Sequence, residues 1–161
     1  MQQSPPIDVV LHQPEIPQNT GTIGRSCVAV GAKLWLVRPL GFRLDDHYLR
    51  RAGLDYWQHL QWEVVDDWSA LSARLAGRRI WLFSKSGNRV HTTVPYAAGD
   101  VLVFGSETQG LPASLLKTHR ESSVRIPITP EARSLNLACA ASVAVYEAMR
   151  HIGFAGETAP Q

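Results

Sequence analysis

Cysteine is scarce in this chain of 161 residues, and several motifs of common enzyme classes are absent. The 2 cysteines, Cys27 and Cys139, form no CxxC pair, which argues against a structural zinc site and favours reduced packing residues. The 6 histidines show no HExxH spacing, so we expect no metal. GxGxxG and GxxxxGK[ST] are also missing, which argues against a nicotinamide-binding Rossmann site and against a P-loop.

Long apolar runs are missing as well. None approaches the roughly 20 residues that span a bilayer, and the first six residues lack the basic and apolar regions of a secretory signal. We therefore expect a cytoplasmic protein with no membrane partner. Length and a hydrophobic content of 45% predict one domain over residues 1–161, with a core over about 7–153 and flexible termini.

The net charge of +2 is too small to indicate nucleic-acid binding by itself. Folding could nevertheless gather separated basic residues into a phosphate-binding face, and ordinary surface charge is an equal alternative. The basic positions are Arg50, Arg51, Arg78, Arg79, Lys85, Arg89, Arg120 and Arg125.

Short apolar runs alternate with helical patterns along the chain. The predicted strands cover 7–11, 33–37, 62–65, 80–83, 101–104 and 124–126. The predicted helices cover 19–30, 45–51 with a break at Gly53, 66 or 67 to 75, 111–119 and 134–151. Such alternation is typical of an α/β fold with a mostly parallel sheet and helices on both faces.

Two irregular loops follow the last two predicted strands. The strand at 101–104 runs into a turn at 105–112, and the loop at 126–130 leads to a helix that opens at 134–136. Ligands bind at the carboxyl ends of strands in open α/β sheets, because backbone amides there lack ladder partners. We expect a small cofactor in these loops.

A further cluster lies near the N-terminus, at residues 17–25. Asn19 is the predicted N-cap of a helix. Gly21 and Gly24 each weaken that helix by up to about 1 kcal/mol. This cost is explained if a ligand or another group closely approaches the first turns of the helix. An arginine on that side, Arg25, would suit a phosphate or ribose. An ordinary capped helix with tolerated glycines is the alternative.

The last helix is rich in alanine, and two of its faces look buried. A face of small residues would allow contact with a symmetry mate in a dimer, and a central core helix in a monomer is the alternative.

The segments 19–25, 102–112 and 126–137 together resemble the motifs of the SPOUT superfamily of knotted RNA methyltransferases, in its TrmH-like branch of ribose 2′-O-methyltransferases. The resemblance covers nearly the whole chain. The chain is short, and together with its segments 15–17 and 50–56 it resembles the minimal subgroup of this branch. That subgroup methylates the wobble nucleotide, position 34 (cytidine or a modified uridine), of certain leucine tRNAs.

The resemblance implies a C-terminal trefoil knot that forms a pocket for S-adenosylmethionine, with S-adenosylhomocysteine as product. The implied cofactor contacts are Phe83, Gly105, Leu111, Ile126, Ser134 and Leu135. It makes Arg25 the leading catalytic residue, with Asn19, Glu107, Ser134 and Asn136 around it. Because arginine stays protonated, we assign Arg25 to phosphate orientation and oxyanion stabilisation. Glu107 is either a base or a residue that holds loop amides.

The resemblance also implies a homodimer that holds the tRNA anticodon loop across both subunits. Arg50, Arg51, Lys85 and Arg89 are the candidate phosphate contacts. Tyr146 is the candidate dimer anchor, with core packing as its alternative. Two other functions stay open, namely methylation of another tRNA or rRNA ribose and RNA binding without catalysis.

Overall fold

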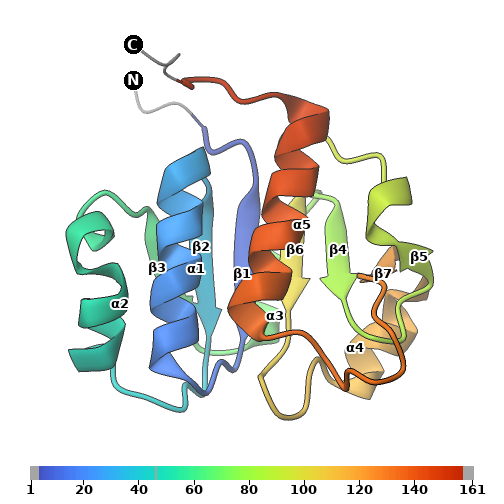
Figure 1. The fold of residues 1–161 in the computed structure, drawn as a ribbon, viewed down its shortest axis with the longest axis horizontal. Coiled ribbons are helices and arrows are strands. Elements are labelled where there is room, and N and C mark those ends of the chain that lie inside the picture. Colours follow the sequence, from blue (N-terminus) through green and yellow to red (C-terminus); the bar gives the residue numbers. More distant parts are fainter. Residues whose placement is uncertain (1–3, 46, 158–161) are drawn as a thin grey trace.

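The computed structural model describes residues 4–45 and 47–157, without the side chains of Tyr48, Arg50, Ala52 and Leu54. Over these residues the chain forms a parallel seven-stranded sheet in the order β3-β2-β1-β6-β4-β7-β5 (Figure 1). The strands are β1 (Asp8–His12), β2 (Lys33–Val37), β3 (Trp62–Val65), β4 (Ile80–Phe83), β5 (Arg89–Val90), β6 (Val101–Phe104) and β7 (Ser123–Arg125). The predicted α/β class with a parallel sheet is confirmed.

Helices cover both faces of the sheet, also as predicted. They are α1 (Pro17–Val30), α2 (His47–Trp57), α3 (Trp68–Arg74), α4 (Ala113–Thr118) and α5 (Leu137–Ile152), with short 3₁₀ turns η1 (His91–Thr93) and η2 (Arg120–Ser122). In Figure 1, α1 and α5 lie side by side in front of the sheet, α2 lies beside α1, and α3 and α4 lie behind.

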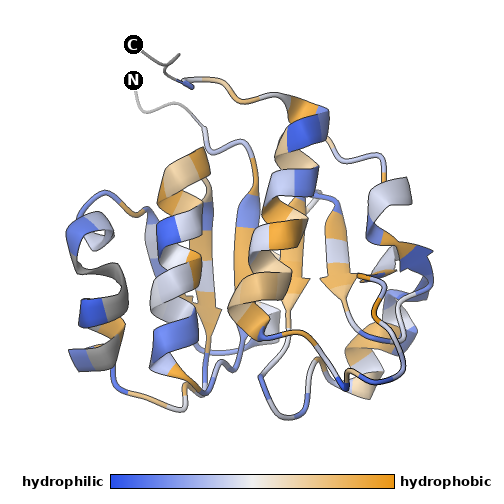
Figure 2. Ribbon diagram, in the orientation of Figure 1, coloured by the Kyte–Doolittle hydropathy of each residue, from blue (hydrophilic) through white to orange (hydrophobic). Residues whose placement is uncertain are grey.

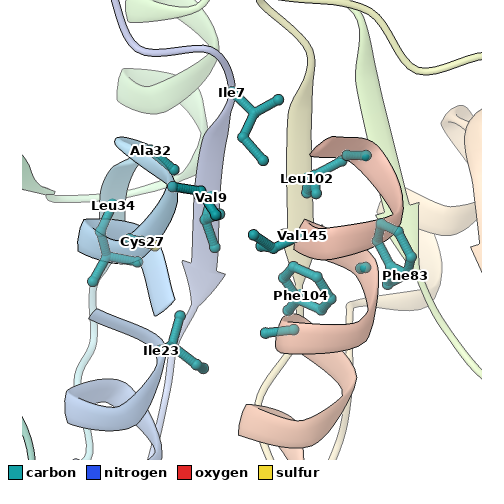
Figure 3. Packing of buried hydrophobic residues seen from close by; sticks show 14 of the residues in the cluster. Ile7, Val9, Ile23, Cys27, Ala32, Leu34, Phe83, Leu102, Phe104 and Val145 are labelled. Atoms are coloured by element: carbon teal, nitrogen blue, oxygen red, sulfur yellow. The ribbon is translucent and has the colours of Figure 1, made fainter. Parts of the chain in front are cut away.

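The central strands are buried on both sides, as strands between two helical layers must be. All five residues of β1 are buried. In front, Val9 and Phe104 pack against Ile23 of α1 and Val145 of α5 (Figure 3). Figure 2 shows the hydrophobic colour concentrated on the strands and mixed with polar positions along the helices.

Two buried carboxylates, each bound by an arginine, lie at the amino-terminal ends of the central strands β1 and β6. Asp8, 1% exposed, accepts hydrogen bonds from Arg78 Nη1 at 2.8 Å and from Trp35 Nε1 at 2.7 Å. Asp100 accepts from Arg79 Nε at 2.8 Å in the same way. These two arginines, candidates for a phosphate-binding face, therefore bind the protein's own carboxylates.

Several predicted boundaries were wrong. The first helix begins at Pro17, so Asn19 lies inside its first turn and is not its N-cap. The second helix continues through Gly53 to Trp57, because a helix tolerates one glycine when tertiary contacts support it. Strand β5 was missed, since two residues carry no periodicity. The trefoil knot and the single domain stay predictions. No helix in the described part of the chain is long and apolar enough to cross a membrane.

Candidate functional site

A cavity of about 470 Å³ lies at the carboxyl ends of β4, β6 and β7, within the size range of small-molecule sites. Its walls come from the loops after these strands and from the first turns of α1 and α5. All six predicted cofactor residues line it, namely Phe83, Gly105, Leu111, Ile126, Ser134 and Leu135. Asn19, Glu107 and Asn136 line it as well, and so does Lys85. The parallel strands thus bring together the loops that the sequence marked separately.

One wall of the cavity is aromatic. Phe83 ends β4 and Phe104 ends β6, and they are register partners in the parallel ladder. Their rings stack with centroids 4.8 Å apart and planes 19° apart, and both line the cavity. Sequence reasoning missed Phe104, although the signal was an aromatic residue at the same end of the neighbouring strand. Ile128 and Leu135, 37% and 39% exposed, add apolar surface near the opening.

The loop after β6 folds back on itself at Gly105. Gly110 donates a backbone hydrogen bond to Ser106 O at 3.0 Å and has a φ of +67°, which favours glycine. A Cβ atom on Gly105 would lie 2.0 Å from the carbonyl carbon of Gly110 and 2.2 Å from Leu111 N. Gly105, one of the implied cofactor contacts, is therefore packed closely by the chain's own backbone, and this packing shapes the cavity wall.

Glu107 ties this loop to the start of α1. Its Oε2 accepts a hydrogen bond from Glu15 N at 2.7 Å, and its Oε1 accepts from Ile16 N at 3.0 Å and Asn19 Nδ2 at 3.2 Å. The carboxylate satisfies amides beside a helix N-terminus, where negative charge is favourable. This geometry supports the reading of Glu107 as a residue that holds loop amides.

Asn19 and Asn136 extend the same network to α5. Asn136 Nδ2 donates to Asn19 Oδ1 at 3.1 Å, while Asn136 Oδ1 accepts from Ala138 N at 2.9 Å and Cys139 N at 3.2 Å. Asn136 is thus the N-cap of α5. The three motifs meet through Glu107, Asn19 and Asn136, and Ser134 lies exposed beside them at the cavity.

Arg25 is exposed on α1 and does not line the cavity. Its Nη2 donates to the Tyr56 hydroxyl at 3.1 Å. The neighbouring Gly24 faces α2, and a Cβ atom there would lie 2.9 Å from the Trp57 ring and 3.1 Å from Leu60 Cδ2. The close approach predicted at Gly24 is therefore helix packing within the chain, and the functional reading of that glycine was wrong.

The predicted RNA contacts do not form one patch on a single chain. Arg51 lies exposed on α2 and Arg89 on β5, at opposite edges of the sheet (Figure 1). Arg89 Nε also donates to Glu121 O at 3.0 Å. Lys85 lies exposed at the cavity, and the side chain of Arg50 falls outside the described residues.

Tyr146 lies on an exposed apolar face of α5. It is 48% exposed, with Val143 at 43% and Phe154 at 41%, and the rings of Tyr146 and Phe154 lie 5.7 Å apart. Tyr146 is therefore not a core residue of the chain. Among the residues whose placement is described, no group of three or more histidine, cysteine or acidic side chains is arranged to hold a metal ion.

Comparison with known proteins gives consistent matches over most of the chain. Residues 6–146 match the SpoU rRNA Methylase family. The tRNA (cytidine(34)-2′-O)-methyltransferase of Methylovorus glucosotrophus is 49% identical over 150 residues, which are 92% of this chain and 97% of that protein. A solved structure concerned with 2-OH methylation of C/U34 on tRNA has a TM-score of 0.86 and 44% identity, and covers 90% of this chain and 95% of its own.

A more distant structure shows a related protein with its cofactor. The SpoU methyltransferase AviRb from Streptomyces viridochromogenes, in complex with AdoMet, has a TM-score of 0.77 and 28% identity, over 89% of this chain and 56% of that chain. The match to the family extends from before β1 into α5 and includes every strand that borders the cavity. The chain belongs to the SpoU rRNA Methylase family.

Proposed function

We propose that the protein is an S-adenosylmethionine-dependent tRNA ribose 2′-O-methyltransferase that acts on the wobble nucleotide, position 34, of leucine tRNAs. The relative from Methylovorus glucosotrophus is named for 2′-O-methylation of cytidine 34, and it matches nearly end to end. A tRNA substrate implies that the enzyme works in the cytoplasm. The choice of leucine tRNAs rests on the resemblance of the segments 15–17 and 50–56 to the minimal subgroup.

The observation that carries the proposal is the cavity at the ends of β4, β6 and β7. An adenine ring needs apolar walls with backbone donors and acceptors at its edge. Phe83, Leu111 and Ile126 would provide the walls, and the loops 105–111 and 126–136 would provide backbone groups. The residues present therefore fit S-adenosylmethionine. When bound, this cofactor supplies an electrophilic methyl group to a ribose 2′-oxygen.

The chain's own residues would act mainly by positioning, which can account for much of the rate of a displacement reaction. Glu107, Asn19 and Asn136 hold the cavity loops to α1 and α5. Ser134 lies at the cavity, where its hydroxyl can bind a substrate or cofactor group. Arg25 would bind the phosphate beside the target ribose and stabilise the developing oxyanion.

We further propose a homodimer through α5. Arg25 does not line the cavity of its own chain, which leaves room for a partner chain to complete the proposed site. The apolar face formed by Val143, Tyr146 and Phe154 offers a contact for a second copy. Such a dimer would hold the anticodon loop across both subunits and would bring Arg51, Lys85 and Arg89 of two chains to one RNA.

The experiment that tests the function uses methyl-labelled S-adenosylmethionine and bulk tRNA that lacks the modification. We expect a labelled 2′-O-methyl nucleoside at position 34 of leucine tRNAs. Label at another nucleotide would overturn the target assignment and keep the chemistry. Measurable cofactor binding without label on any tRNA or rRNA would favour RNA binding without catalysis.

A further inference from the structure

Tyr56, near the end of α2, holds the side chain of Arg25 in two ways. The Tyr56 hydroxyl accepts a hydrogen bond from Arg25 Nη2 at 3.1 Å. The guanidinium carbon also lies 4.6 Å from the centroid of the Tyr56 ring, within the range of a cation–π contact. We infer that Tyr56 is a positioning residue that fixes the Arg25 guanidinium for the methyl-transfer reaction. This inference rests on the proposed function.

The packing of α1 on α2 explains how the two side chains meet. Gly24 precedes Arg25, and Trp57 follows Tyr56. Because Gly24 has no side chain, the Trp57 ring approaches α1 to within 2.9 Å of where a Cβ atom would stand. Trp57 also packs against Trp62 of β3, with ring centroids 5.1 Å apart. The close contact at Gly24 and Trp57 therefore sets the distance between the adjacent pair, Arg25 and Tyr56.

The two contacts constrain different movements of the guanidinium. The hydroxyl fixes the position of Nη2, and the ring holds the guanidinium carbon near its centroid, so a long exposed side chain loses much of its rotamer freedom before RNA arrives. Guanidinium has five N–H donors, and one hydrogen bond to Tyr56 leaves the others for a phosphate. Because the phenol is neutral, this partner does not compensate the charge of Arg25, in contrast to the carboxylates that bind Arg78 and Arg79.

A double-mutant cycle tests the inference. We compare the single-turnover rates of the wild type, Tyr56→Phe, Tyr56→Leu, Arg25→Ala and the combined variants. Steady-state assays give the KM of each for S-adenosylmethionine, and thermal unfolding gives its Tm. Tyr56→Phe removes the hydroxyl and should lower the rate about tenfold. Tyr56→Leu also removes the ring and should lower it further. The KM for S-adenosylmethionine should not change, because Arg25 is assigned to the RNA phosphate and is not among the residues that line the cofactor cavity.

The cycle separates positioning from a structural role. In the Arg25→Ala background, neither substitution at Tyr56 should lower the rate further, because the side chain to be positioned is gone. Gln58→Ala is the matched control. Gln58 lies two residues after Tyr56, is exposed, and contacts His59 rather than Arg25. It should behave as the wild type.

Three results would overturn the inference, given an active wild type. One is a wild-type rate for both Tyr56 variants. Another is an equal loss of rate with and without Arg25, and the third is a raised KM for S-adenosylmethionine at an unchanged rate. A wild type that leaves every tRNA unlabelled would instead overturn the proposed function, and the inference with it.

Discussion

Replacement of Glu107 by glutamine should lower both the stability of the fold and the affinity for the cofactor. The carboxylate accepts three hydrogen bonds, from Glu15 N, Ile16 N and Asn19 Nδ2. Glutamine has only one acceptor oxygen. If that oxygen takes the place of Oε1, the amide N–H₂ group faces the N–H of Glu15, which now donates across 2.7 Å to the carboxylate.

The magnitude follows from the lost contacts. A hydrogen bond to a charged group contributes about 1.5–3 kcal/mol, and negative charge at a helix N-terminus about 0.3–1 kcal/mol. Glu107 is only half-buried, so we expect the lower part of the range, about 2 kcal/mol. For a chain of this size, each kcal/mol changes the Tm by about 2–4 °C, which predicts a decrease of about 4–8 °C.

The assay combines thermal unfolding with cofactor titration and turnover. Glu107→Gln should lower the Tm and weaken S-adenosylmethionine binding, while turnover at saturating cofactor falls less than tenfold. Glu121→Gln, the same change at an exposed position in η2, is the control and should leave all three unchanged. A general base would behave differently. An unchanged Tm with turnover reduced about 100-fold or more would refute the positioning role.

The remaining predictions concern the cavity, the ion pair between Arg78 and Asp8, and the two thiols. Gly105→Ala places a methyl group against the Gly110–Leu111 peptide, so titration should show S-adenosylmethionine binding weakened at least about tenfold, with about 1–3 kcal/mol of stability lost. Arg78→Ala leaves buried Asp8 without its cation and should cost about 3 kcal/mol in urea unfolding. Burial raises the pKa of Cys27 to about 12, so at pH 8 a thiol reagent should modify only exposed Cys139 in the folded protein and both after unfolding.

Each of these has a clear contrary result. Cofactor binding by Gly105→Ala at wild-type strength would show that the loop yields without disturbing the cavity. Unchanged urea stability of Arg78→Ala would show that Asp8 is satisfied by Trp35 alone. Rapid reaction of both thiols in the folded protein would show that α1 opens on the time scale of the assay, which its packing between the sheet and its neighbours does not predict.

The amino-acid sequence by itself determined most of the strands and the place of the cavity. The runs 33–37, 62–65, 80–83 and 101–104 predicted four strands to the residue, because buried strands bounded by Gly, Pro and polar residues are read from local composition. The rule that ligands bind at strand carboxyl ends then located the cavity. The residues carried over from the family motifs line it, apart from Arg25.

Only the tertiary structure decided which groups meet. The sequence predicted a close approach at Gly24 without its partner, which is the Trp57 ring of the same chain, and the close packing of Gly105 on the Gly110–Leu111 peptide appears only in the folded loop. Arg78 binds Asp8, which lies 70 residues away, and Arg51 and Arg89 fall at opposite edges of the sheet. Local patterns report burial and backbone conformation, whereas such pairings depend on the strand order β3-β2-β1-β6-β4-β7-β5, which long-range packing sets.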